Sequence, residues 1–278
     1  MSLDQDTLHQ LLDTIRRFVR NRLMPLEEQV ASTDQIPESV ISEMRELGLF
    51  GLTIPEEYGG LGLNTEEECK VAIELGYTSA AFRSVIGTNN GIGSQGLVMD
   101  GTDDQKENYL PRLASGEIIG SFALTEPNVG SDSANVQTKA EKDGDSYILN
   151  GTKRWITNAN IANLFTVFAR TDQSQKGSSG VSAFLVDANT PGISLSSKYK
   201  KMGQQGAHVC DVIFDNCRVP EVNIIGGPNN VNNGFKTAMK TLDRGRIHIS
   251  AFAVGCAKRL IEISTQFSLE REQLDRKS

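Results

Sequence analysis

Two short segments combine hydroxyl, glycine and aromatic residues in an order that suits a flat, anionic ligand. Residues 118–124 form an apolar run that breaks into the loop Thr125-Glu126-Pro127-Asn128-Val129-Gly130-Ser131-Asp132. Such a loop exposes backbone N–H groups that can face an anion, beside the hydroxyls of Thr125 and Ser131. Residues 149–158 contain the only tryptophan of the chain, Trp155, and a threonine two residues later. A large aromatic face next to a hydroxyl suits a flat ring with polar edges.

The same residues would also fit a β-hairpin with a polar turn and a tryptophan in the core. Polar loops and single tryptophans are common, so residue types alone leave both interpretations open. The residue order is more specific: an apolar pair, T-E-P, two variable residues and G-S-D are followed downstream by L-N-G-T-K-R-W-I-T-N. In pattern and separation, these segments resemble the paired flavin-binding motifs of the acyl-CoA dehydrogenase family.

The resemblance implies FAD as the cofactor and gives the motif residues roles. Trp155 is expected to cover one face of the isoalloxazine ring, and Ile156 and Thr157 to reach its polar N5/O4 edge. Ser131 is expected near both the pyrophosphate and the bound substrate. The full set of expected cofactor residues in the two motifs is Phe122, Leu124, Thr125, Gly130, Ser131, Trp155, Ile156 and Thr157.

The resemblance also implies an acyl-CoA substrate, from which a base takes the α proton while a β hydride passes to the flavin. Asp243 and Arg246 match family positions that contact the CoA moiety, although mixed charge on a helix is usually just a solvated face.

Arg83-Ser84 resembles a pair that meets the distal carboxylate of the substrate in the glutaryl-CoA dehydrogenase branch. An exposed helix arginine is the ordinary alternative. Because a guanidinium fork suits a carboxylate, we expect a dicarboxylic acyl-CoA, such as the glutaryl, adipyl or pimelyl ester, over a plain fatty acyl-CoA.

No residue of the chain is assigned as the catalytic base. Most relatives place their catalytic glutamate late in the C-terminal helices, which here would lie beyond Ser278. A minority place it at the position of Gly245, which has no side chain to accept a proton. Glu126 belongs to the flavin loop and is not assigned as base. The family's R-x-Q-F-G motif begins as Arg271-Glu272-Gln273 and then departs at Leu274-Asp275, so a C-terminally truncated member is expected.

Partners follow from the same resemblance. Electrons would pass to an electron-transferring flavoprotein, and the C-terminal helices would assemble homo-dimers or homo-tetramers in which Arg271 reaches the flavin of a neighbour.

Three alternative functions stay open: an acyl-CoA oxidase or desulfinase on the same scaffold, a non-catalytic flavin or thioester binding module, and an inert fragment. Oxygen consumption or sulfite release would distinguish the first of these from a dehydrogenase.

The order of apolar patterns predicts three regions that position these residues. Helical spacing dominates residues 1–116, as in Leu8, Leu11, Leu12 and Ile15, with helices expected over 4–23, 80–99 and other segments. Short β-type runs fill residues 117–229, and one long helix begins near Gly234 in region 230–278. The expected fold class is α+β and multidomain: an all-α N-terminal domain, an antiparallel β-barrel or sandwich, and the start of a C-terminal helical bundle. No G-x-G-x-x-G opens a βαβ unit, which disfavours a nicotinamide site.

Composition excludes several other classes. The chain of 278 residues has a formal net charge of −7 and a pI of about 5.1, unlike a nucleic-acid binder. Its four cysteines and three histidines lack ligand spacing, so no metal site is expected. No segment reaches the ~20 apolar residues of a membrane helix, and no signal or transit peptide is visible. A cytoplasmic location is expected, with the mitochondrial matrix as the alternative for a processed chain.

Overall fold

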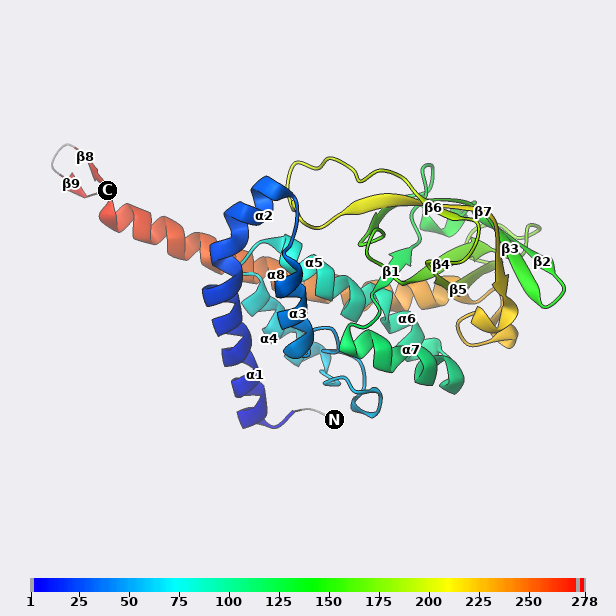
Figure 1. Ribbon diagram of the computed structural model, residues 1–278, viewed down its shortest axis with the longest axis horizontal. Helices are drawn as coiled ribbons and strands as arrows, with labels where there is room; N and C mark the ends of the chain where they lie inside the picture. Colours follow the sequence, from blue (N-terminus) through cyan, green and yellow to red (C-terminus); the bar gives the residue numbers. More distant parts are fainter. Residues whose placement is uncertain (1–2, 274–275, 278) are drawn as a thin grey trace.

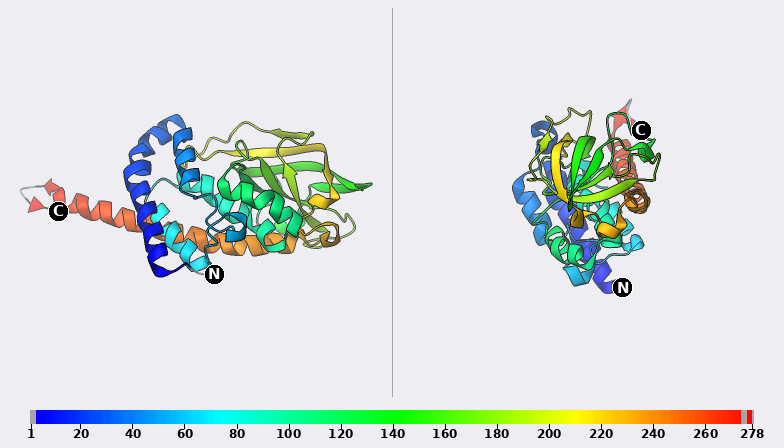
Figure 2. Two further views of the ribbon diagram at one scale, coloured as in Figure 1. Left: turned by 60° about the horizontal axis from the view of Figure 1, so that its bottom comes forward. Right: turned by 90° about the vertical axis from the view of Figure 1, so that its right-hand side faces the viewer.

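The computed structural model describes residues 3–273 and 276–277 and shows the three regions in the predicted order. The helical region leads into a curled β-sheet, and a long final helix runs from beside the sheet past the N-terminal helices to a projecting end (Figure 1). Two further views show the sheet on one side of the molecule and the helices on the other (Figure 2). The predicted fold class is confirmed.

The N-terminal helices begin at recognisable capping residues. Asp4 accepts a hydrogen bond from the backbone N–H of Thr7, and Asn64 forms a reciprocal capping box with Glu67. The helices of this region are α1 (Gln5–Phe18), α2 (Glu27–Thr33), α3 (Glu38–Glu46), α4 (Thr65–Leu75), α5 (Ala80–Thr88), α6 (Gln95–Asp100) and α7 (Asp103–Ser115).

Two helix predictions differ from the structure at their ends. The first helix does not stop near Pro25, because a π-helical turn (Val19–Leu23) and a 3₁₀ turn (Met24–Leu26) carry the chain into α2. Pro25 lies in the first turn of the 3₁₀ segment, where its missing N–H has no partner to lose. The single helix predicted over 80–99 is broken at Asn89–Gly93, where Gly91 has φ −89° and ψ −107°.

The middle region is one seven-stranded sheet with the path β1-β4-β2-β3-β7-β6, and β5 pairs with β4. Its pairs are antiparallel as predicted, except that β4 is parallel to β1 and meets β2 in a short parallel contact. β1 enters the sheet directly from α7, not through a hairpin. The strands are β1 (Gly120–Ala123), β2 (Lys139–Asp143), β3 (Ser146–Thr157), β4 (Leu164–Arg170), β5 (Val181–Asp187), β6 (Ile193–Leu195) and β7 (Val209–Pro220), and a two-stranded ribbon pairs β8 (Glu272–Gln273) with β9 (Arg276–Lys277).

A buried asparagine connects the helices to the sheet. Asn89 is fully buried, and its Nδ2 donates to the carbonyl oxygens of Phe50 and Leu113, each at 3.0 Å. Its Oδ1 accepts from the backbone N–H of Gly120, the first residue of β1, at 2.8 Å. One side chain therefore satisfies backbone groups of both regions, as buried polar groups require.

The last helix, α8 (Gly234–Glu270), crosses α4 at a pair of glycines. A Cβ at Gly255 would lie 2.1 Å from the carbonyl oxygen of Ile73, and one at Gly76 would lie 2.4 Å from that of Phe252. Only hydrogen atoms fit at such distances, so the two helix backbones touch here. This crossing fixes α8 against the N-terminal region.

We predict that Gly255→Ala lowers the free energy of unfolding by about 3 kcal/mol, because the methyl group forces the two helix backbones apart. Gly245→Ala on the same helix is the matched control. Its Cβ would lie 3.4 Å from the nearest atom, a side-chain carbon of Ile92, so it should gain up to about 1 kcal/mol of helix propensity. Urea unfolding followed by circular dichroism measures both, and equal stabilities for the two variants would contradict the backbone contact.

Candidate active site

The two predicted motif segments meet at one cavity. Its volume is 360 Å³, and it lies between the loop after β1, the end of β3, the kink after α5 and the helix α8. The backbone N–H of Arg154 donates to the carbonyl of Thr125 at 2.8 Å, which joins the two segments directly. All of the expected motif residues line this cavity: Phe122, Leu124, Thr125, Gly130, Ser131, Trp155, Ile156 and Thr157.

A β-bulge turns Trp155 toward this cavity. The register between β3 and β7 shifts between Lys153 and Ile156, and Trp155 has a φ of +57°. A bulge inserts an extra residue and re-aims the side chains beside it. Trp155 is 60% exposed although it is a large apolar residue, so the structure holds an open aromatic face at the cavity.

A buried ion pair holds the loop behind the cavity. The Nζ of Lys153, which is 0% exposed, lies 2.7 Å from Oε1 of Glu126 and donates to the carbonyl of Leu124 at 3.2 Å. Glu126 also accepts from the backbone N–H groups of Gln137 and Thr138 at 2.7 and 2.8 Å. Both charges are therefore compensated, as buried charges must be. Glu126 is fully engaged by these contacts, which agrees with its not being assigned as base.

The electrostatics of the pair follow from burial. Burial would raise the pKa of Glu126, but the ammonium of Lys153 and hydrogen bonds from Thr138 outweigh it and hold that pKa below its ordinary value. Burial lowers the pKa of Lys153 to about 8, against the opposing effect of the Glu126 carboxylate. Lys153 carries no predicted role in the sequence pattern, although it lies within the second motif.

A second cavity of 410 Å³ adjoins the first. The two share Thr88, Ile92, Thr157, Leu242 and Arg246. The second is lined in addition by Arg83 and Ser84 from α5 and by Gly245 from α8. Arg83 thus faces a cavity next to the motif residues and is not the solvated arginine of the alternative interpretation.

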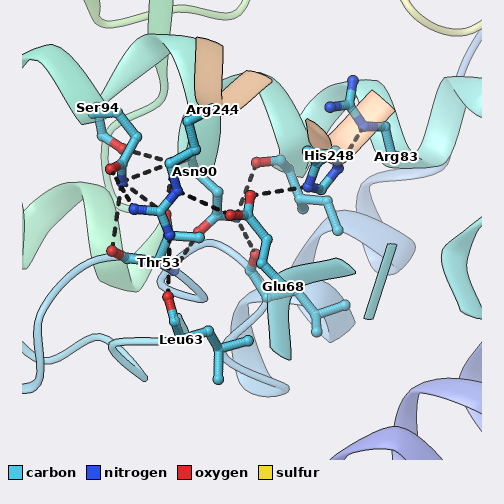
Figure 3. A network of polar contacts seen from close by, with 11 residues as sticks. Thr53, Leu63, Glu68, Arg83, Asn90, Ser94, Arg244 and His248 are labelled. Carbon is cyan, nitrogen blue, oxygen red and sulfur yellow. Dashed lines mark hydrogen bonds and ion pairs between the residues drawn. The ribbon is translucent and has the colours of Figure 1, made fainter. Parts of the chain in front are cut away.

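Arg83 belongs to a polar network between α4, α5 and α8 (Figure 3). Its Nε donates to Nε2 of His248 at 3.0 Å, and Nδ1 of His248 lies 2.9 Å from Oε1 of Glu68. Arg244 donates from Nε to Oε2 of Glu68 at 3.0 Å. Burial lowers the pKa of Arg83 to about 10, although the charge of Glu68 opposes this. Burial would raise the pKa of Glu68, but His248 and Arg244 keep it below its usual value.

Glu68, His248 and Arg244 were missed by sequence reasoning. The histidines were considered only as metal ligands. The sequence contains one signal for this cluster. Arg244 and His248 are four residues apart, so they must share a face of α8.

Comparison with known proteins identifies the family. Three family models match in sequence order: the N-terminal domain of acyl-CoA dehydrogenase over residues 5–117, its middle domain over 121–217 and its C-terminal domain over 232–278. The chain is 39% identical over 261 residues to the probable acyl-CoA dehydrogenase YngJ of Bacillus subtilis, covering 94% of this chain and 68% of that protein. This chain belongs to the acyl-CoA dehydrogenase family.

Solved structures of two acyl-CoA dehydrogenases share the fold closely. A glutaryl-CoA dehydrogenase from Mycobacterium smegmatis in complex with FADH2 superimposes with a TM-score of 0.88 at 32% identity, covering 99% of this chain and 68% of that one. Butyryl-CoA dehydrogenase from Megasphaera elsdenii gives a TM-score of 0.92 at 32% identity, covering 100% of this chain and 73% of that one. One relative is named for a dicarboxylic acyl group and the other for a plain one.

Within this acyl-CoA dehydrogenase chain, the residues expected to contact CoA divide. Arg246 lines both cavities, whereas Asp243 lies at the surface and forms an ion pair with Arg246. Arg271 follows the last residue of α8, about 37 Å along the helix from Arg246. It is therefore not brought to the cavities of its own chain, and its predicted role toward a neighbouring subunit stays a prediction. Leu274 and Asp275, where the motif departs from the family pattern, lie outside the described residues.

Neither a metal cluster nor a membrane-spanning helix appears in the part of the chain that the structure describes. No group of three or more His, Cys, Asp or Glu side chains there could hold a metal ion. Every helix within residues 3–273 and 276–277 is too short or too polar to span a bilayer.

Proposed function

We propose that this chain holds FAD in the first cavity and the acyl end of an acyl-CoA thioester in the second, as the cofactor and substrate parts of an α,β-dehydrogenase. The observation that carries the proposal is the convergence of both motif segments on one cavity that opens onto a second. The lining suits a flavin, because it combines the apolar side chains of Phe122 and Ile156 with the exposed ring of Trp155 and the hydroxyl-bearing Thr157.

FAD would supply the acceptor for a hydride from the acyl Cβ. The protein would orient the two molecules, since Thr157 lines both cavities and so lies at their boundary. Trp155 would cover the open side and exclude water. Among the described residues, no carboxylate lines either cavity, and Gly245 offers none. We therefore assign the proton-accepting glutamate to a C-terminal segment, at the position expected beyond Ser278.

We further propose a dicarboxylic acyl-CoA, such as glutaryl-CoA or adipyl-CoA, as the substrate. The second cavity is lined by Arg83 and by no carboxylate of the described residues, so an anionic end group would find a cationic partner there. A plain acyl chain would leave the terminal nitrogens of a half-buried guanidinium without a hydrogen-bond acceptor, which is costly. An electron-transferring flavoprotein as electron acceptor, and a homo-oligomeric assembly, complete the proposal.

Titration with FAD tests the cofactor assignment, with Trp155 as an internal reporter. Because Trp155 is the only tryptophan, its emission reports on this cavity alone. We expect FAD to quench that emission with saturation, and the protein to keep a yellow flavin spectrum after gel filtration at a mass near 30.3 kDa.

Replacement of Trp155 by alanine should weaken FAD binding about tenfold through loss of the stacking face. Flavin absorbance after gel filtration measures this variant, which lacks the reporter. If tryptophan emission does not change on addition of FAD, and the purified protein is colourless, the proposed cofactor site is overturned. The remaining test uses a longer protein that includes the C-terminal glutamate. If acyl-CoA never reduces the absorbance of its bound FAD, the binding-module alternative is favoured.

A further inference from the structure

Glu68, His248 and Arg83 form a buried line that leads from α4 through α8 to the second cavity. Glu68 and His248 are buried, and Arg83 is half-buried. Each member comes from a different helix, so the line exists only because α8 crosses α4 closely. Figure 3 shows His248 between the carboxylate of Glu68 and the guanidinium of Arg83.

The contacts fix the protonation state of His248. An arginine Nε–H can only donate, so Nε2 of His248 must accept with its lone pair at 3.0 Å. The ring proton then lies on Nδ1, which donates to Oε1 of Glu68 at 2.9 Å. The geometry therefore requires a neutral imidazole in the Nδ1–H tautomer, because a second proton on Nε2 would meet the Nε–H of Arg83.

Two arginines lie near Glu68, and they differ in whether their terminal nitrogens already have acceptors within the protein. Arg244 contacts Glu68 directly, and its terminal nitrogens donate to Oε1 of Gln95 at 2.9 Å and to the carbonyl of Leu63 at 3.1 Å. Arg83 reaches Glu68 only through His248. No acceptor among the described residues binds the two terminal nitrogens of Arg83, which lines the second cavity.

A neutral spacer changes what Arg83 can do. A direct contact with Glu68 would engage the guanidinium of Arg83 in an ion pair, and its charge would then be compensated within the protein. With His248 between them, the Nε is anchored while the terminal fork keeps its charge and its donors for a ligand. Gly87, one turn further along α5, leaves room for this placement, since a Cβ there would lie 2.6 Å from the Nε of Arg83.

We propose that His248, held in its Nδ1–H tautomer by Glu68, is a positioning residue that aims the terminal fork of Arg83 at the distal carboxylate of the acyl-CoA. The inference rests on the proposed dicarboxylic substrate and adds the device that makes Arg83 selective. His248 itself contacts no reacting atom in this assignment. It sets the direction of the guanidinium, and Glu68 sets the tautomer of His248.

Nitrogen NMR of protein labelled with ¹⁵N-histidine tests the tautomer without any substrate. The chain has three histidines, so each signal can be assigned by single substitution. At pH 7 we expect His248 to show a protonated Nδ1 and an unprotonated, hydrogen-bonded Nε2. Glu68→Gln should change the tautomer balance of His248. A His248 that is charged, or protonated on Nε2, would overturn the inference.

Calorimetric titration of the FAD-loaded protein with glutaryl-CoA and butyryl-CoA tests the positioning role. His248→Leu removes the acceptor and should lower the ratio of glutaryl-CoA to butyryl-CoA affinity about tenfold, the worth of a hydrogen bond to a charged group. His248→Gln can still accept from Arg83 and donate to Glu68, so it should restore most of the ratio. His9→Gln on exposed α1 is the control and should leave the ratio unchanged.

A second variant keeps the test decisive if His248→Leu fails to fold. Gly87→Ala adds a methyl group against the guanidinium while favouring the helix, so it should lower the same ratio without unfolding the protein. A wild-type ratio near one would refute the dicarboxylic substrate itself. A high wild-type ratio that depends on Arg83, yet survives both His248→Leu and Gly87→Ala, would refute the positioning role alone.

Discussion

Replacement of Lys153 by methionine is expected to lower the free energy of unfolding by about 3–5 kcal/mol, because it leaves the buried carboxylate of Glu126 without its counter-ion. The same change should abolish retention of FAD, since the carbonyl of Leu124 and the loop that begins at Thr125 lose their anchor. Urea unfolding and flavin absorbance after gel filtration measure the two effects.

Two further variants separate the buried charge from general damage to the sheet. Lys142→Met on β2 removes an exposed ion pair with Glu221 and should cost no more than about 1 kcal/mol. The double variant Lys153→Met with Glu126→Gln should recover part of the loss, because the side chain is then uncharged and its one amide oxygen can still accept from the backbone N–H of Gln137 or of Thr138. A double variant less stable than Lys153→Met would contradict the assigned cause.

Arg83→Met is expected to reduce the preference of the FAD-loaded protein for glutaryl-CoA over butyryl-CoA about 100-fold. The distal carboxylate would lose its cationic partner in a cavity where the described residues offer one other lining arginine, Arg246. Affinity for butyryl-CoA should change little, because methionine keeps much of the apolar side-chain volume. Calorimetric titration with both esters gives the ratio.

Arg246→Met is the matched control for this prediction. Arg246 lines both cavities, and its proposed partner is the CoA moiety common to all substrates. The substitution should therefore weaken both esters alike and leave their ratio intact. A high ratio that survives Arg83→Met would contradict the proposed role of Arg83, and a wild-type ratio near one would favour a plain acyl-CoA as the substrate.

The parts of the site that the sequence predicted are those encoded by consecutive residues. The change from helical to strand periodicity near residue 117 predicted the order of the three regions. The two motifs predicted that their residues come together at one site. Had Thr125 and Trp155 lain on opposite sides of the molecule, the flavin interpretation would have failed. They meet because the loop after β1 contacts the last residues of β3, where the backbone N–H of Arg154 donates to the carbonyl of Thr125.

The parts that the sequence could not predict depend on partners distant along the chain. His248 meets Glu68 across 180 residues and Arg83 across 165. Each of these side chains alone fits an ordinary helix face, and only the packing of α8 on α4 brings them together. The bulge at Trp155 was hidden for a similar reason, since a register shift is a property of two paired strands.

The buried amide of Asn89 has a consequence for how the protein comes apart. It joins Phe50 and Leu113 of the helical region to the first residue of β1. Separating the sheet from the helices would break the hydrogen bond to Gly120, which contributes about 0.5–1.5 kcal/mol. Neither region is therefore expected to melt ahead of the other, and the helices and the sheet should share one thermal transition.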